Sequence, residues 1–175
     1  MTLSISGITI SDRDFIDALY LLPSLTKLTF DDFRTIVHPI TSLFLSSLTL
    51  HDSDSDSVPE PRSILVPNLC ALSIKCHGTS FDDSAFVDAV TSRWLPDPSY
   101  TAAIGVASLR SVVLRFRERE VDEDVYRGLY ELDKVGMRWG RREVNEEADM
   151  PLRARSNLER MGMRVVITGK DFMGV

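Results

Sequence analysis

Apolar residues recur along the chain in a short pattern, apolar-x-x-apolar-x-apolar, with polar residues between them. The second and third copies each follow after 20 residues, the fourth after 24 and the fifth after 40. The copies are Ile5-Ile8-Ile10, Leu25-Leu28-Phe30, Leu45-Leu48-Leu50, Leu69-Leu72-Ile74 and Leu109-Val112-Leu114. Alternating apolar positions are typical of half-buried strands, and a period of about 20 to 29 residues is typical of leucine-rich repeats.

A second repeat relates LDKVGMRW, residues 132–139, to LERMGMRV, residues 158–165. Each copy predicts the end of a helix, a glycine and the start of a strand, since glycine accepts the left-handed backbone of a helix C-cap. Gly136 and Gly162 are the predicted caps. The strands predicted after them span residues 136–144 and 163–168. Together with the five copies above, strands start near residues 5, 25, 45, 69, 109, 137 and 163.

The segments between these strands place apolar residues on one helical face. In the segment 83–95, Phe86 and Val90 share such a face, and Asp83 or Ser84 is the predicted N-cap. The predicted helices span residues 12–22, 83–95, 122–135 and 151–161, with a short helical turn over 32–38 that ends before Pro39.

Strands that alternate with helices pair in parallel. The sequence therefore predicts an α/β fold, a leucine-rich-repeat-like solenoid of about seven strand units. It fills residues 1–175 as one domain, with an irregular acidic loop at 51–63 and a long connector at 95–107. We expect the amino-terminal repeat, which has no capping helix before it, to make the chain marginally stable or self-associating.

The residues that flank the inner apolar positions are small, polar or charged, and they are predicted to line the concave side of the stack. Such a surface suits protein recognition by side-chain hydrogen bonds, although a solvated sheet face that binds nothing has the same composition. The candidate protein-binding residues are Lys27, Thr29, Asp31, Thr49, His51, Ser73, Lys75 and Arg115.

Charge and cysteine content narrow the function classes. The net charge of −6 disfavours binding to nucleic acid. No apolar run is long enough to span a membrane, and the first residues lack the pattern of a secretory signal. Cys70 and Cys76 form no zinc motif, so Cys76 is expected to be a buried thiol in a reducing compartment, the cytoplasm or the nucleus.

No motif for a nucleophile, a phosphate loop, a cofactor or a metal is present, so we expect no enzyme and no cofactor. One constellation keeps a hydrolase open as a distant alternative, because His51 with Asp31 and Asp32 offers acid–base groups. The aspartates that recur at positions 12, 32 and 52 have a simpler interpretation as acceptors of backbone N–H bonds where a strand turns into a helix.

The string LVPNLCALSIKCHGTSFDDSAFVDAVTSRWLPD, residues 65–97, resembles the leucine-rich-repeat regions of F-box-like proteins from mushroom-forming fungi, the basidiomycetes. VASLRSVVLRF, residues 106–116, and the helix end LDKVGMR are similar to the same family, and the resemblance covers about residues 20–175. The motifs that carry it are Pro67-Asn68-Leu69, Asp82-Asp83, Phe86-Val87-Asp88 and Ser92-Arg93-Trp94.

The resemblance implies a protein-binding module, the substrate-recognition part of an F-box-type ubiquitin ligase subunit. No segment of this chain reads as the F-box that docks a Skp1-type adaptor, so that partner is expected only if an F-box exists outside this chain. The target protein is not identified. The alternative is a stand-alone structural or regulatory repeat scaffold with no ubiquitin link.

Overall fold

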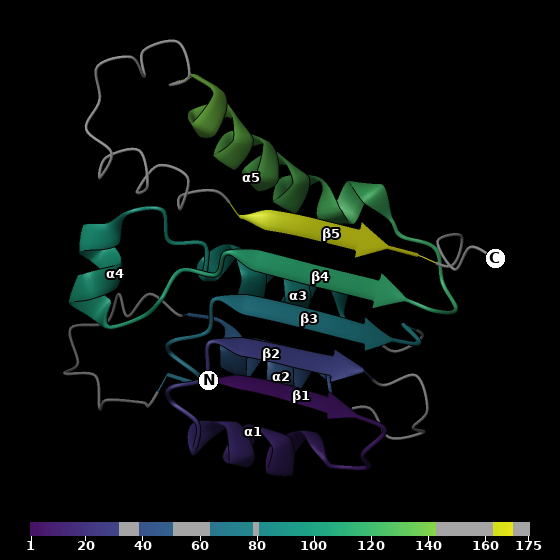
Figure 1. Ribbon diagram of the computed structural model, residues 1–175. Helices are drawn as coiled ribbons and strands as arrows, with labels where there is room; N and C mark the ends of the chain where they lie inside the picture. Colours follow the sequence, from purple (N-terminus) through teal and green to yellow (C-terminus); the bar gives the residue numbers. More distant parts are fainter. Residues whose placement is uncertain (32–38, 51–63, 79–80, 143–162, 170–175) are drawn as a thin grey trace, which may run out of the picture.

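The computed structural model describes residues 1–31, 39–50, 64–78, 81–142 and 163–169, and for residues 133–142 it describes the backbone alone. Five strands form one all-parallel sheet in chain order (Figure 1). They are β1 (Thr2–Ser6), β2 (Lys27–Asp31), β3 (Ala71–Cys76), β4 (Ser111–Phe116) and β5 (Arg164–Thr168). The helices are α1 (Asp12–Tyr20), α2 (Ser42–Leu48), α3 (Asp83–Ser92), α4 (Pro98–Ile104) and α5 (Glu123–Arg142).

The register of the sheet follows the apolar pattern of the sequence. Leu28, Leu72 and Val112 lie side by side on β2, β3 and β4, and Val165 of β5 continues that row. The next inner row is Phe30, Ile74, Leu114 and Ile167. The repeat pattern therefore predicted the strands at 28–30, 72–74 and 112–114 correctly, and the strand predicted at 163–168 is confirmed.

The core lies between the inner rows of the sheet and a single layer of helices. In Figure 1, α2 and α3 lie behind the strands, and α1 lies next to the β1 edge. Phe15 of α1 packs against Phe30 and Phe44, and Phe86 of α3 packs against Tyr126 of α5. A parallel sheet whose strands keep chain order places its crossover helices on one face, since moving to the other face requires the strand order to reverse. The opposite face carries none of the described helices.

Side-chain caps define where four helices begin. Ser11, Thr41, Asp82 and Asp97 each accept a hydrogen bond from a backbone N–H in the first turn of α1, α2, α3 and α4. The cap of α3 is thus Asp82, one residue before the earlier of the two predicted caps, Asp83 and Ser84. The helices predicted at 12–22 and 83–95 are confirmed with slightly earlier ends.

The strand predicted at Leu45-Leu48-Leu50 is wrong, because this segment belongs to α2 and the turn after it. Phe44, Leu45 and Leu48 are buried on one helical face. The three-residue spacing from Leu45 to Leu48 fits one face of a helix as well as it fits the start of the strand pattern. The N-cap at Thr41 favours the helix.

The strand predicted at 136–144 is also wrong, since α5 runs through Gly136 to Arg142 and Gly136 caps nothing. In the first copy, Leu3 and Ile5 of β1 occupy the inner rows, whereas Ile8 and Ile10 follow the strand. About seven strand units therefore become five strands within the described residues.

Smaller expectations have mixed outcomes. The connector 95–107 contains α4, which ends at Gly105 with a left-handed backbone, φ 67°. Cys76 is buried as expected, and both cysteines are free thiols. The predictions for 32–38, 51–63, 151–161 and Gly162 lie outside the described residues.

Candidate functional site

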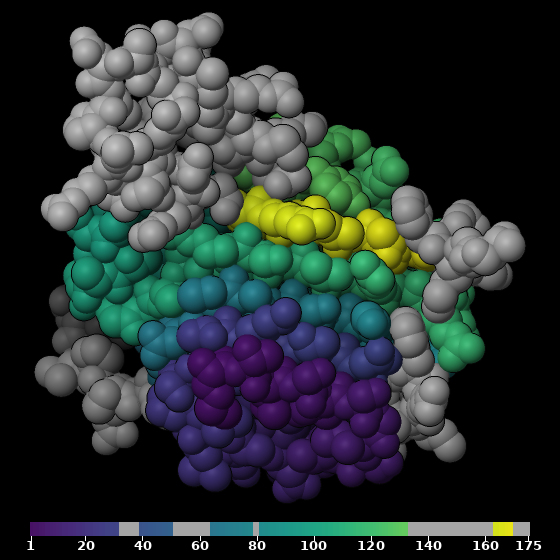
Figure 2. Space-filling model, viewed as in Figure 1, coloured from purple at the N-terminus to yellow at the C-terminus, as the bar shows by residue number. Residues whose placement is uncertain are grey.

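Six of the eight candidate binding residues lie together on the side of the sheet that carries none of the described helices. Because side chains alternate along a strand, those that do not point into the core point to this side. We call it the open face, and Figure 2 views it directly, with the strands as successive bands of colour. It consists of Thr2, Ser4, Ser6, Lys27, Thr29, Asp31, Ala71, Ser73, Lys75, Ser111, Val113, Arg115, Arg164, Val166 and Thr168.

The register sorts these side chains into three rows that cross the strands. The first row is Thr2, Lys27, Ala71, Ser111 and Arg164. The middle row is Ser4, Thr29, Ser73, Val113 and Val166. The last row is Ser6, Asp31, Lys75, Arg115 and Thr168. The middle row has short, uncharged side chains, and the charged side chains lie in the first and last rows.

The other two candidate residues do not belong to this surface. Thr49 follows α2, is half-buried and donates its hydroxyl to the carbonyl oxygen of Leu45 at 3.1 Å. Its assignment to the binding face was wrong for the same reason as the strand, because residues 42–48 are helical. His51 lies outside the described residues.

The charges of the open face are unequally paired. Lys75 forms an ion pair with Asp31, its neighbour across the strands, at 3.3 Å. Lys27, Arg115 and Arg164 are exposed and make no side-chain hydrogen bond or ion pair with the residues that the structure describes. Sequence reasoning omitted Arg164, although the strand it predicted at 163–168 places this residue in register with Lys27.

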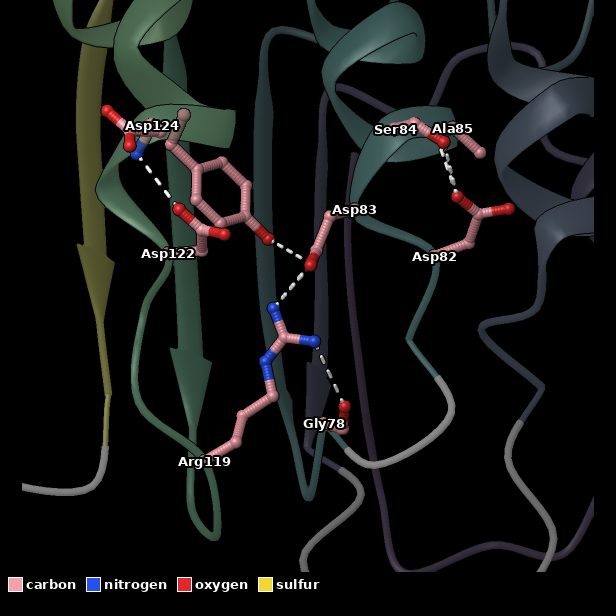
Figure 3. A network of polar contacts seen from close by, with 9 residues as sticks. Gly78, Asp82, Asp83, Ser84, Ala85, Arg119, Asp122 and Asp124 are labelled. Carbon is pink, nitrogen blue, oxygen red and sulfur yellow. Dashed lines mark hydrogen bonds and ion pairs between the residues drawn. The ribbon is translucent and has the colours of Figure 1, made fainter.

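A second polar cluster lies at the carboxyl ends of β3 and β4 (Figure 3). Arg119 lies in the segment after β4 and donates to both carboxylate oxygens of Asp83, in the first turn of α3, at 2.6 Å. Arg119 also donates to the carbonyl oxygen of Gly78 at 3.3 Å and lies over the ring of Phe116. Tyr126 of α5 donates its hydroxyl to the same carboxylate.

This cluster links α3, α5 and the segment after β4, and its polar groups bind one another. Asp83 already accepts bonds from a guanidinium and a phenol, and its side chain is one-fifth exposed. Tyr126 is fully buried, and burial together with the neighbouring carboxylate raises the pKa of its phenol. Sequence reasoning did not find the cluster, because its members are 36 and 43 residues apart and form no local pattern.

The Ser-Arg-Trp motif quoted for the family resemblance has a structural role. Arg93 is buried, and its guanidinium donates to the carbonyl oxygens of Leu48, Leu65 and Val66 at 2.6, 2.5 and 3.2 Å. Desolvation lowers the pKa of Arg93 to about 10. Ser92 accepts a hydrogen bond from the N–H of Leu50 at 3.1 Å. The motif thus ties two segments, the end of α2 and the turn before β3, to the end of α3.

Of the three groups proposed for a hydrolase, Asp31 is the one within the residues that the structure describes. Asp31 pairs with Lys75, and both Asp32 and His51 fall outside those residues. Across the described ranges, no group of three or more histidine, cysteine or acidic residues is placed to hold a metal ion. No helix in the described part is long and apolar enough to cross a bilayer.

Comparison with known proteins assigns no family to this chain. No protein-family model, no curated protein and no solved structure matches the chain.

Proposed function

We propose that this chain is a leucine-rich-repeat-like module that binds a protein on the open face of its sheet. The observation that carries the proposal is the register, which gathers six sequence-selected polar residues on a surface free of the described helices. Repeated strand–helix units bury a common core and leave one sheet face for recognition, and polar side chains on several strands give it specificity.

A photo-cross-linking experiment tests the use of this face. A photoreactive residue replaces Ser73, in the middle of the open face, or Asp88, exposed on α3 on the helical side. We expect a defined protein adduct from position 73 alone, and its loss when Trp replaces Thr29 beside it. Equal adduct patterns from both positions would contradict the proposal.

By resemblance, we further propose that the module selects substrates for an F-box-type ubiquitin ligase in the cytoplasm or nucleus. The deciding experiment recovers the endogenous gene product, with whatever coding sequence lies upstream of Met1, and assays the complex for a Skp1-type adaptor. Recovery of the adaptor supports the ligase. Its absence, with the target still bound, leaves a stand-alone repeat scaffold.

A further inference from the structure

We infer that the partner presents an extended, acidic segment to the open face. The inference rests on the proposed function and specifies the chemistry of its partner. It starts from charge, because the chain as a whole carries −6. Within the described residues, the open face carries four cations and one carboxylate: Lys27, Lys75, Arg115, Arg164 and Asp31.

The unpaired charges are what make this face suited to an anionic ligand. Asp31 already neutralises Lys75, whereas Lys27, Arg115 and Arg164 have no partner in the described part of the chain. Among the described residues no acid pairs with these three exposed cations, which repel one another weakly. An acidic ligand removes that repulsion and gains complementary contacts, with faster association at low salt.

The spacing of these cations favours an extended ligand that crosses the strands. Lys27 and Arg164 lie in the same row, three strands apart, so their backbones are separated by about 14 Å. Arg115 lies four residues along β4 from that row, at about 13 Å. An extended chain advances about 3.3 Å per residue, so acidic residues about four positions apart reach both Lys27 and Arg164.

The surface between the cations has room for such a chain. Ala71 and Ser111 stand between Lys27 and Arg164, and Ser73 lies beside them in the middle row. These side chains are short, so a ligand backbone can approach the sheet and meet hydroxyl groups. A polynucleotide is the competing anionic ligand, but the surrounding negative charge of the protein opposes a long polyanion more than a short acidic segment.

Selection from a library of short random peptides tests the inference. Wild-type protein is compared with the double variant Arg115→Glu/Arg164→Glu. The matched control is Arg13→Glu/Arg127→Glu, which makes the same change in net charge at exposed positions on α1 and α5. We expect wild type and control to enrich peptides rich in Asp and Glu. A selected peptide should bind the face variant at least about tenfold more weakly, and added salt should weaken wild-type binding.

Three results would overturn the inference. Enrichment of apolar or basic peptides contradicts an acidic partner, as does a labelled oligothymidylate that binds as tightly as the best peptide. A third result combines two variants: the selected peptides no longer bind when Trp replaces Ser73, but they bind the Arg115→Glu/Arg164→Glu variant normally. This result contradicts an acidic partner and still supports the proposed protein-binding face. Selected peptides that tolerate both changes contradict the proposed function as well. Thermal melting shows that each variant is folded.

Discussion

At the scale of single residues, Asp83 accepts hydrogen bonds from two distant side chains that no local sequence pattern connects to it. Asp83→Ala removes the acceptor for the buried Tyr126 hydroxyl and for the guanidinium of Arg119. A partly buried donor left unpaired costs about 1–3 kcal/mol, so we expect a loss of about 2–4 kcal/mol in the free energy of unfolding. Urea denaturation measures it. Asp88→Ala, on the same helix but exposed, is the control and should change stability by less than about 0.5 kcal/mol.

Tyr126 gives a prediction for alkaline pH. The pKa of its phenol is raised in the fold above the value of about 10 expected in the unfolded chain. As pH rises past 10, the unfolded state loses the proton first, so this tyrosine's contribution to stability falls with increasing pH. We expect wild type to lose about 1.4 kcal/mol from this group by pH 11, and Tyr126→Phe to lack that loss.

The measurement is urea denaturation at neutral pH and near pH 11, with the pH-dependent differences compared. Tyr100→Phe is the control, since Tyr100 is exposed on α4 and should leave the alkaline slope unchanged. Equal alkaline slopes for wild type and Tyr126→Phe would contradict the coupling of this phenol to folding.

At the scale of elements, Arg93 holds the end of α2 and the turn before β3 to the end of α3. Its guanidinium serves three carbonyl oxygens, one of them on Val66, whose backbone is left-handed with φ 43°. Arg93→Ala leaves these carbonyls unsatisfied and opens a cavity, so we expect a loss of about 3 kcal/mol or more. Arg13→Ala, exposed on α1, is the matched control. A similar small loss for both variants would refute the structural role of this residue.

The elements also show what sequence periodicity can and cannot predict. The copies at Leu28, Leu72 and Val112 were predicted correctly because alternation and burial agree there. The copy at Leu45 has the same apolar spacing in a helix, and only the Thr41 cap distinguishes the two. Gly136 fits a helix end by composition, yet α5 continues through it, since one glycine costs a helix only about 1 kcal/mol. Six residues of the open face were predicted from the repeat pattern, and the wrong strand at Leu45-Leu48-Leu50 had also placed Thr49 there.

Ser46, on the exposed side of α2, tests the assignment of that element. In a helix, alanine is favoured over valine by about 0.6 kcal/mol, whereas in an exposed strand valine is favoured. We therefore expect Ser46→Ala to be more stable than Ser46→Val. Thermal melts of the two variants decide the sign. Greater stability of the valine variant would contradict the helix and support the strand that the repeat pattern predicted.

At the scale of the whole molecule, the helical side of the sheet carries most of the stability, and the open side is the one that we propose for recognition. The helical side buries the apolar rows and holds the polar links of Asp83 and Arg93. The open side keeps small and charged residues that contribute little to folding. Substitutions at Thr29, Ser73 or Arg115 should therefore separate binding from stability, which is the property that the cross-linking and peptide experiments require.

The β1 edge of the sheet supplies the last prediction. β1 is an edge strand, and edge strands expose backbone groups that pair readily with a second copy. Apolar side chains are also exposed in this unit, above all Leu21, which is 81% exposed beside Tyr20 at the end of α1. We expect concentration-dependent self-association in sedimentation velocity. Ser4→Lys combined with Leu21→Glu should reduce it, because charge on an edge strand and its border opposes pairing between copies. Leu43→Glu, exposed on α2 away from β1, should leave it unchanged. A wild-type protein that stays monomeric over a wide range of concentration would contradict this prediction.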